Sequence, residues 1–187
     1  MPKTTPTPRE LRDAYDRGEN IIQLLNGEVG DPPGETSIEL SYDLQSGGYV
    51  EAFDARAEVR DRKKVFMGAV KSIIDDLGGV ESVLDAGVGE GTTLWSFLSQ
   101  FENPPPIIHG SDLCWSRLAV CRDWLARQTP RLNVDVVAAS LSEMPYQDNS
   151  FDLVYTVHSI EPNRGREQEI IHELFRVAGK YLVLIEP

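Results

Sequence analysis

The chain has 187 residues, a length that suits a single domain. It carries 18 Lys and Arg against 30 Asp and Glu, for a net charge of −12 at pH 7. This acidity disfavours nucleic acid and anionic lipid as partners, because both need clustered basic side chains. No apolar run approaches the ~18 residues of a membrane span, and the N-terminus MPKTTPTPRE lacks the apolar stretch of a signal peptide. We therefore expect neither nucleic acid nor a membrane as a partner.

The two cysteines, Cys114 and Cys121, fall in one predicted helix. Their spacing separates them by about two helical turns, roughly 10 Å along the axis. That separation is too large for a disulfide. We expect two free thiols, half-buried on a helix face, and a reduced, cytoplasmic setting.

The first predicted helix begins after Thr7, with Pro8 in its first turn and Glu10 three residues after the cap. This is the capping-box pattern. The run ELRDAYDRGENIIQLLN continues it with one apolar stripe, and Gly18 is its weak point.

Less regular sequence follows. Residues 27–35 (GEVGDPPGE) have the glycines and prolines of a turn, and SIELSYDL and QSGGYV resemble a short apolar segment and a glycine-bearing loop. Residues 51–77 predict one long helix, which Gly78 and Gly79 end.

From residue 81 onward, short apolar strands alternate with helices. The predicted strands are 82–86, 107–111, 134–139, 151–157 and 181–185, and the predicted helices are 91–101, 114–128 and 164–178. Continuous apolar strands indicate a parallel sheet covered on both faces. The fold class is therefore α/β: a Rossmann-like, doubly wound, mostly parallel sheet over residues 81–187, with residues 1–80 as an N-terminal helical extension or lid.

The most informative segment is VLDAGVGEGTTL, where a strand ends and Gly87, Gly89 and Gly91 precede a helix. Such glycines let a ligand approach the backbone closely. The G-x-G-x-G spacing differs from the G-x-G-x-x-G of dinucleotide folds and from the phosphate-binding loop with its Lys. Asp85 and Glu90 bring negative charge, which suits a cationic ligand such as S-adenosylmethionine (SAM). A ligand-free glycine turn is the structural alternative.

Two further features lie at the carboxyl ends of neighbouring strands, where open α/β sheets bind ligands. Asp112 ends the second strand and can accept hydrogen bonds from both ribose hydroxyls; alternatively it only caps the next helix. Residues 144–146 (Met-Pro-Tyr) follow the third strand, and we expect them beside a bound adenine.

The order VLDAGVGEGTTL, GSDLCWSRL, MPYQDNSFDLVYTVHSIE and ELFRVAGKYLVLIEP resembles the class I SAM-dependent methyltransferases, with a type 11-like domain, over about residues 82–187. The resemblance implies a methyl transfer that uses SAM and leaves S-adenosylhomocysteine.

By the same resemblance, specific positions would hold the cofactor. Asp85, Ala86, Gly87 and Gly89 would hold its methionine end, Asp112 its ribose, and Leu113, Ser140 and Leu141 its adenine. Many relatives carry Asp at the position of Ser140, so a weaker hydroxyl acceptor stands where a carboxylate is usual.

The segment SIELSYDLQSGGYVEAF also resembles bacterial methyltransferases found with surface-polysaccharide and nonulosonic-sugar genes. This implies a small-molecule or glycan-precursor acceptor. Tyr42 and Tyr49 are candidates for lining its pocket, or they are ordinary core aromatics.

By this resemblance the full sheet would have seven strands, and the sequence predicts only the first five, so we expect strands 6 and 7 to be missing. An uncovered fifth strand is an edge for pairing. We expect either a longer natural chain or a homodimer.

His158 is the candidate general base, because its ordinary pKa of about 6.5 suits proton removal near neutral pH; a purely structural histidine is the alternative. Glu161 is a weaker candidate. His109 and His172 are expected to be structural, and no cluster has metal-ligand spacing.

Three functions remain open. The sequence favours a SAM-dependent methyltransferase acting on a small molecule. The alternatives are a non-catalytic SAM- or nucleoside-binding module and an NAD(P)-dependent oxidoreductase, and the G-x-G-x-G spacing argues against the oxidoreductase.

Overall fold

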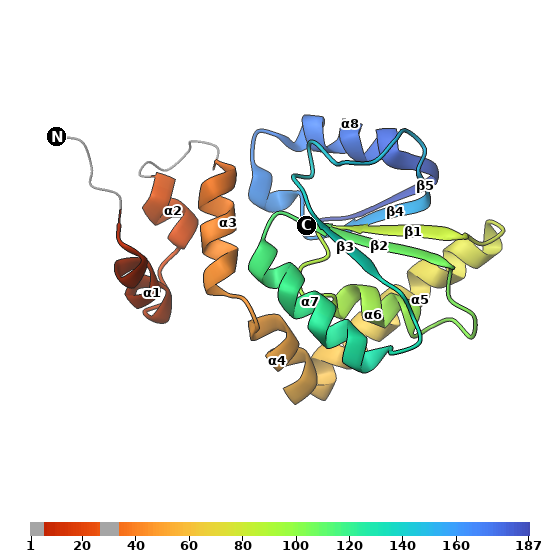
Figure 1. Cartoon of the computed structure of the whole chain (residues 1–187), viewed down its shortest axis with the longest axis horizontal. Helices are drawn as coiled ribbons and strands as arrows, with labels where there is room; N and C mark the ends of the chain where they lie inside the picture. The colour runs from red at the N-terminus through yellow and green to blue at the C-terminus, as the bar shows by residue number, and fades with distance from the viewer. Residues whose placement is uncertain (1–5, 27–33) are drawn as a thin grey trace.

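The computed structural model describes residues 6–26 and 34–187. Its centre is a five-stranded parallel sheet with strand order β3-β2-β1-β4-β5 (Figure 1). The strands are β1 (Ser82–Ala86), β2 (Ile107–Asp112), β3 (Asp135–Ala138), β4 (Phe151–Val157) and β5 (Ala178–Ile185). The predicted Rossmann-like α/β sheet is confirmed, and β1 and β4 match their predicted bounds to the residue.

Helices lie on both faces of the sheet, as the continuous apolar strands required. They are α1 (Pro8–Asp16), α2 (Ile21–Asn26), α3 (Glu35–Leu44), α4 (Gly48–Ala55), α5 (Ala57–Asp76), α6 (Thr92–Leu98), α7 (Trp115–Gln128) and α8 (Glu167–Val177), with a short 3₁₀ turn, η1 (Glu161–Asn163). In Figure 1, α5, α6 and α7 cover one face and α8 covers the other. None of the helices in the described ranges is long and apolar enough to cross a membrane.

Each face of the sheet has its own core. Val83 of β1 packs with the side chains of α5, α6 and α7, and the next residue, Leu84, packs with those of α8. Both are fully buried. Successive strand residues point to opposite faces, so both must be apolar when both faces are covered.

The long helix predicted for residues 51–77 is wrong, because the chain turns at Arg56 and forms α4 and α5 instead. The turn has favourable partners that the periodicity could not reveal. The Arg60 guanidinium donates to the Phe53 and Asp54 carbonyls at the end of α4, at 3.1 and 3.3 Å. The Trp124 indole N–H donates to the Asp54 carboxylate at 3.2 Å. These bonds replace those that a continuous helix would have made.

The N-terminal segment is helical, as predicted, with the capping box of Thr7 and Glu10 in place. However, Gly18 takes φ 77° and ends the first helix, so the predicted single stripe lies on two helices, α1 and α2. Residues 37–44, read as an apolar segment, belong to α3. Most of the predicted turn at 27–35 lies outside the described residues.

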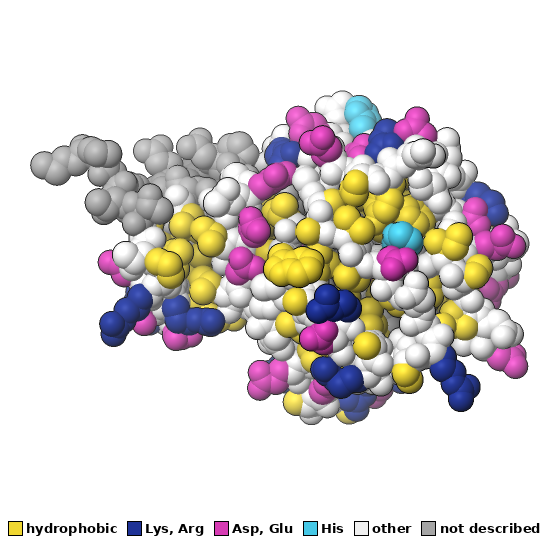
Figure 2. Space-filling view, viewed as in Figure 1, with side chains coloured by type: hydrophobic (Ala, Val, Ile, Leu, Met, Phe, Trp, Pro, Cys, Tyr) yellow, Lys and Arg dark blue, Asp and Glu magenta, His cyan; other side chains and the backbone are white. Residues whose placement is uncertain are grey.

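Figure 2 shows apolar side chains gathered over the N-terminal helices and near the start of α7, with acidic and basic side chains interspersed around them. Trp115, at the start of α7, is 60% exposed. The two cysteines are free, as predicted, but both are fully buried rather than half-buried, because α7 packs them into the interior.

Candidate functional site

A cavity of ≈ 650 Å³ lies at the carboxyl ends of β1, β2 and β4. These strand ends face α3 in Figure 1. Side chains of α3, α4 and α5 form the opposite wall, including Ile38, Tyr42 and Tyr49. The volume lies in the range of small-molecule sites, and the position is where open α/β sheets bind ligands. Tyr42 and Tyr49, predicted as candidates, both line the cavity.

The glycine loop forms the floor of this cavity. Gly87, Gly89 and Gly91 have φ of 85°, 55° and 79°, a region that L side chains rarely adopt. The backbone N–H groups of Gly87 and Val88 donate to the Ser111 carbonyl at 2.7 and 2.8 Å. The loop is therefore folded back against β2. Glycine is needed there because the backbone has positive φ, and it also leaves room for a ligand to approach the backbone.

Asp112 lines the cavity at the tip of β2. One carboxylate oxygen accepts the Gly89 N–H at 2.8 Å, and the other accepts the Cys114 N–H at 2.9 Å. The capping role weighed from the sequence is thus present, since Cys114 is the N-cap residue of α7. A carboxylate has about four acceptor positions, so Asp112 retains capacity for ribose hydroxyls, and that role stays a prediction.

Arg117 of α7 covers the central glycine of the loop. A Cβ built on Gly89 would overlap the Arg117 guanidinium, and Gly89 is not among the described residues that line the cavity. The guanidinium lies 4.8 Å from the Tyr42 ring centre and 4.9 Å from that of Tyr49, and 3.9 Å from Asp112. Its Nε is buried without a hydrogen-bond partner among the described residues. Arg117 has no motif of its own, so nothing in the sequence pattern marked it as a site residue.

Asp85 and Ala86 lie behind the lining, with exposed fractions of 2% and 0%. The Tyr155 hydroxyl donates to the Asp85 carboxylate at 2.9 Å. Burial raises the pKa of Asp85 to about 7, although the Tyr155 hydrogen bond and the Lys63 charge act the other way. Asp85 therefore lies beneath the glycine loop and supports it. Asp85 would reach a ligand in the cavity only indirectly, for example through a bound water.

Lys63 is a second residue that the sequence analysis missed. Its ammonium donates to the Thr92 and Thr93 hydroxyls at 2.7 and 2.9 Å, and burial lowers its pKa to about 8. One stripe of α5 lines the cavity with Lys63 at its centre: Val59, Arg62, Lys63, Phe66 and Met67. The residues of this stripe have the i, i+3, i+4, i+7 spacing of one helix face. Because two of them are charged, the stripe does not stand out as an apolar face in the sequence.

Glu90, expected to bring charge to the ligand loop, uses both oxygens elsewhere. They accept the backbone N–H groups of Gly47 and Val50 at 2.8 and 2.7 Å. These donors lie at the start of α4, where helix N–H groups lack partners. Glu90 is 1% exposed, so its role is to fasten α4 to the glycine loop.

Ser140 and Leu141 follow β3 and line the cavity, as predicted for the adenine side. The predicted position of residues 144–146 beside a ligand is wrong. Met144 is 4% exposed and packs in the core beneath α8, and Tyr146 packs on the rings of His109 and Phe151. Burying these large side chains against the α8 side of the sheet is more favourable than exposing them at the cavity.

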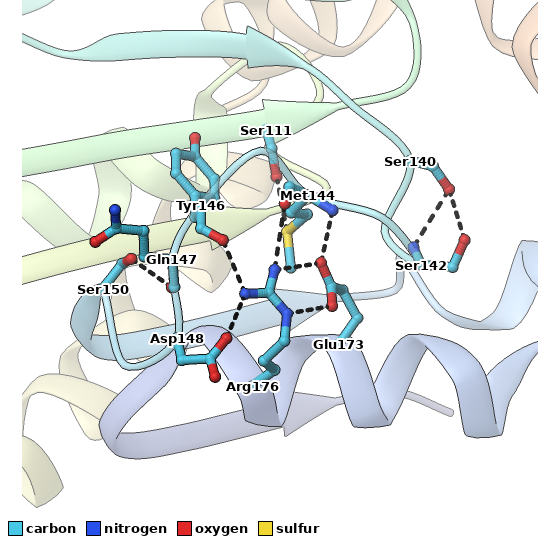
Figure 3. A network of polar contacts seen from close by, with 10 residues as sticks. All are labelled: Ser111, Ser140, Ser142, Met144, Tyr146, Gln147, Asp148, Ser150, Glu173 and Arg176. Atoms are coloured by element: carbon cyan, nitrogen blue, oxygen red, sulfur yellow. Dashed lines mark hydrogen bonds and ion pairs between the residues drawn. The ribbon is translucent and has the colours of Figure 1, made fainter.

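An arginine on α8 fixes the segment after Ser140, as Figure 3 shows. The Arg176 guanidinium donates to the Tyr146 carbonyl and to the Asp148 carboxylate, both at 2.8 Å. Glu173, one turn earlier, accepts the Met144 N–H at 2.7 Å and pairs with Arg176. These contacts hold the segment in one conformation and so place Ser140 and Leu141 at the cavity.

His158 lines the cavity from the segment after β4. Its φ of 54° is uncommon for a residue other than glycine, and its backbone N–H donates to the Ile185 carbonyl at 2.9 Å. The ring has no hydrogen-bond partner among the described residues. Backbone strain at a site favours a functional position, while the base role stays a prediction. His109 lies in β2 and the exposed His172 in α8, away from the lining.

Comparison with known proteins identifies the family. A family model described as a methyltransferase domain matches residues 83–180, more than half of the chain. The chain belongs to this family of methyltransferase domains. No curated protein matches the chain in sequence.

Solved structures with the same fold include three at low sequence identity. A SAM-dependent methyltransferase from Methanococcus maripaludis, described as putative, has TM-score 0.54 and 17% identity over 64% of this chain and 55% of its own. One from Aquifex aeolicus has TM-score 0.52 and 21% identity over 62% of each chain. The (4+2)-cyclase SpnF has TM-score 0.63 and 21% identity over 83% of this chain and 61% of its own. The chain thus spans less than two thirds of each.

Proposed function

We propose that the chain transfers a methyl group from SAM to a small-molecule or glycan-precursor acceptor. The observation that carries this proposal is the cavity bounded by the glycine loop and Asp112 within a methyltransferase-family domain. When bound, SAM supplies a methyl group already activated by its sulfonium. The protein then contributes mainly positioning and the exclusion of water.

The residues present fit such a cofactor. Asp112 offers acceptor capacity for hydroxyls, Gly87 lets a ligand approach the backbone, and Leu141 offers an apolar surface. The carboxylate of Asp112 suits a ligand with cationic groups. We assign Asp85, Ala86, Gly87 and Gly89 to the methionine end of the cofactor, because they form or support the loop that follows β1.

We assign the acceptor to the space between α5 and the segment after β4. Its walls carry the apolar Phe66 and the ring of His158, with Tyr42 and Tyr49 covering it from the N-terminal helices. Residues 1–80 would then act as a lid over the core at 81–187. His158 would take a proton from an oxygen or nitrogen acceptor.

Incubation with methyl-labelled SAM and a pool of bacterial small molecules tests the proposal. Label should move into the small-molecule fraction with release of S-adenosylhomocysteine. His158→Ala should slow this transfer by roughly 10²–10⁴-fold without weakening S-adenosylhomocysteine binding. His172→Ala is the matched control, on the exposed side of α8. Binding of the cofactor without transfer to any acceptor would contradict the proposal.

That last outcome would favour the second candidate, a SAM-binding module without methyl transfer. Two observations support keeping it: the His158 ring has no orienting partner in the described part of the chain, and SpnF has this fold yet is named a cyclase. An enzyme base usually has a group that orients it.

Two further predictions remain proposals. The free, buried thiols of Cys114 and Cys121 fit a reducing, cytoplasmic setting. Pairing of two copies along β5 is supported by its place at the edge of the sheet. Analytical ultracentrifugation tests the pairing: a monomer at micromolar concentration would contradict it.

A further inference from the structure

The hydroxyl of Ser140 is engaged by the protein itself. It donates to the Glu35 carboxylate at 2.5 Å and accepts the Ser142 N–H at 3.2 Å, with the Ser142 hydroxyl 2.9 Å away. A hydroxyl has one donor and two acceptor positions, so this one has little capacity left for a ligand. The predicted hydrogen bond from an adenine amino group to the Ser140 hydroxyl is therefore not supported.

Glu35 brings a carboxylate to the same place from 105 residues away in the sequence. It begins α3, whose residues Ile38 and Tyr42 line the cavity. Positions 35, 38 and 42 follow the i, i+3, i+7 spacing of one helix face. Glu35 thus lies on the same stripe of α3, one turn before Ile38. It is not itself among the described lining residues, and it adjoins the cavity through its hydrogen bond with the lining residue Ser140.

The Glu35 carboxylate is held in its charged form. Arg166 donates to its Oε1 at 2.6 Å, beside the bond from Ser140. The hydrogen bonds from Ser140 and Arg166 lower the pKa of Glu35, against the effect of burial. The other oxygen, Oε2, has no hydrogen-bond partner among the described residues. An ionised oxygen therefore remains available beside Ser140.

The backbone N–H of Leu141, next along the chain, also has no partner in the described part of the structure, and Leu141 lines the cavity. The Glu35 acceptor and the Leu141 donor thus both adjoin Ser140, just after the end of β3. Adenine has the complementary pair, since its 6-amino group donates and its neighbouring ring nitrogen accepts. Asp112 at the end of β2 is paired in register with Ala138 of β3, so a ribose on Asp112 would place a base nearby.

We propose that Glu35 is the adenine-reading residue of this site, supplying from the N-terminal helices the carboxylate that Ser140 lacks. This inference rests on the proposed function, because it assumes that the ligand is an adenosine cofactor. It makes α3 part of the cofactor site, whereas the sequence predicted residues 1–80 only as a helical extension or lid.

The test compares two ligands on each protein by isothermal titration: S-adenosylhomocysteine and S-inosylhomocysteine, in which an oxygen replaces the 6-amino group. Wild type should prefer the adenosine compound. Glu35→Gln should narrow that preference by about tenfold or more, because a charged acceptor is lost and a donor is gained. The matched control is Glu39→Gln on the same helix, and it should keep the wild-type ratio.

Arg166→Gln separates recognition from a purely structural latch between α3 and α8. If Glu35 only fastens α3, both Glu35→Gln and Arg166→Gln should lower the melting temperature and leave the ligand ratio unchanged, which would overturn the inference. A ratio that narrows in Glu35→Gln far more than in Arg166→Gln supports it. The ratio is measured within one sample, so a partly unfolded fraction does not alter it. Failure of wild type to bind S-adenosylhomocysteine would instead refute the proposed function.

Discussion

The carboxylate of Asp112 accepts the backbone N–H of Gly89 at 2.8 Å, and this bond joins the tip of β2 to the glycine loop after β1. The acid and the loop were identified separately in the sequence, 23 residues apart. The structure shows that they form one unit at the floor of the cavity. A change at either residue should therefore affect both the loop and ligand binding.

Asp112→Ala should weaken S-adenosylhomocysteine binding by roughly 1–3 kcal/mol, because charged hydrogen bonds to ribose would be lost. Isothermal titration measures the change. Asp76→Ala is the control, since Asp76 is exposed at the end of α5 and away from the lining. An affinity equal to that of wild type would remove Asp112 from the cofactor site.

Gly87→Ala should destabilise the fold more than Gly18→Ala does. Both glycines have similar backbone angles, with φ of 85° and 77°. A Cβ at Gly87 would overlap the Ser159 side chain, whereas a Cβ at Gly18 would meet nothing within 4 Å. Gly18→Ala should cost about 1 kcal/mol of backbone strain, and Gly87→Ala about 1–3 kcal/mol more. Urea denaturation compares them, and equal losses would contradict the close packing at Gly87.

Glu90→Gln should release α4 from the glycine loop, because a carboxamide offers one acceptor where the carboxylate offers two. The buried N–H left without a partner should cost about 1–3 kcal/mol. Hydrogen exchange should speed up at the Gly47 and Val50 amides. Glu102→Gln, at an exposed position, should leave their exchange unchanged. Unaltered protection in Glu90→Gln would show that α4 is held by other contacts.

The sheet was predictable because its signals are local. Unbroken apolar runs such as 82–86 and 151–157 identify buried parallel strands, and glycines after a strand identify the turn. Gly87, Asp112, Leu113, Ser140, Leu141 and His158 all line one cavity, as their positions after strands imply.

What could not be predicted depends on contacts between distant segments. Arg60 and Trp124 stabilise the turn at Arg56, and no periodicity in residues 51–77 reveals those partners. Glu35 meets Ser140 across 105 residues. Arg117 lies on a predicted helix, but its position over Gly89 depends on Tyr42 and Tyr49 from the N-terminal segment. Packing of this kind has no signature in one sequence.

Asp85→Asn should change how stability depends on pH. Burial raises the pKa of Asp85 to about 7 in the folded chain, above its ordinary value of about 3.9. Between these values the folded state holds a proton that the unfolded chain has lost, so Asp85 makes stability fall as pH rises from about 4 to about 7. The variant has no such proton, so its stability relative to wild type should rise by roughly 1–4 kcal/mol across this window.

Urea denaturation at about pH 5 and pH 7.5 measures this change, with Asp76→Asn as the exposed control. The window stays below the pKa of Lys63, which burial lowers to about 8. Lys63 acts in the opposite direction, since between about 8 and its ordinary value the unfolded chain holds the extra proton and stability rises with pH. A constant difference between Asp85→Asn and wild type from pH 5 to 7.5 would contradict the raised pKa of Asp85.

We assign the cavity between the strand ends and the N-terminal helices to a SAM-type cofactor, and this assignment can be tested by binding alone. Isothermal titration of the wild-type chain with S-adenosylhomocysteine, at protein concentrations above ~10 µM, tests it most directly. We expect one site with a dissociation constant below ~1 mM and no comparable binding of NAD. Absence of binding at ~1 mM S-adenosylhomocysteine, or equal binding of NAD, would contradict it.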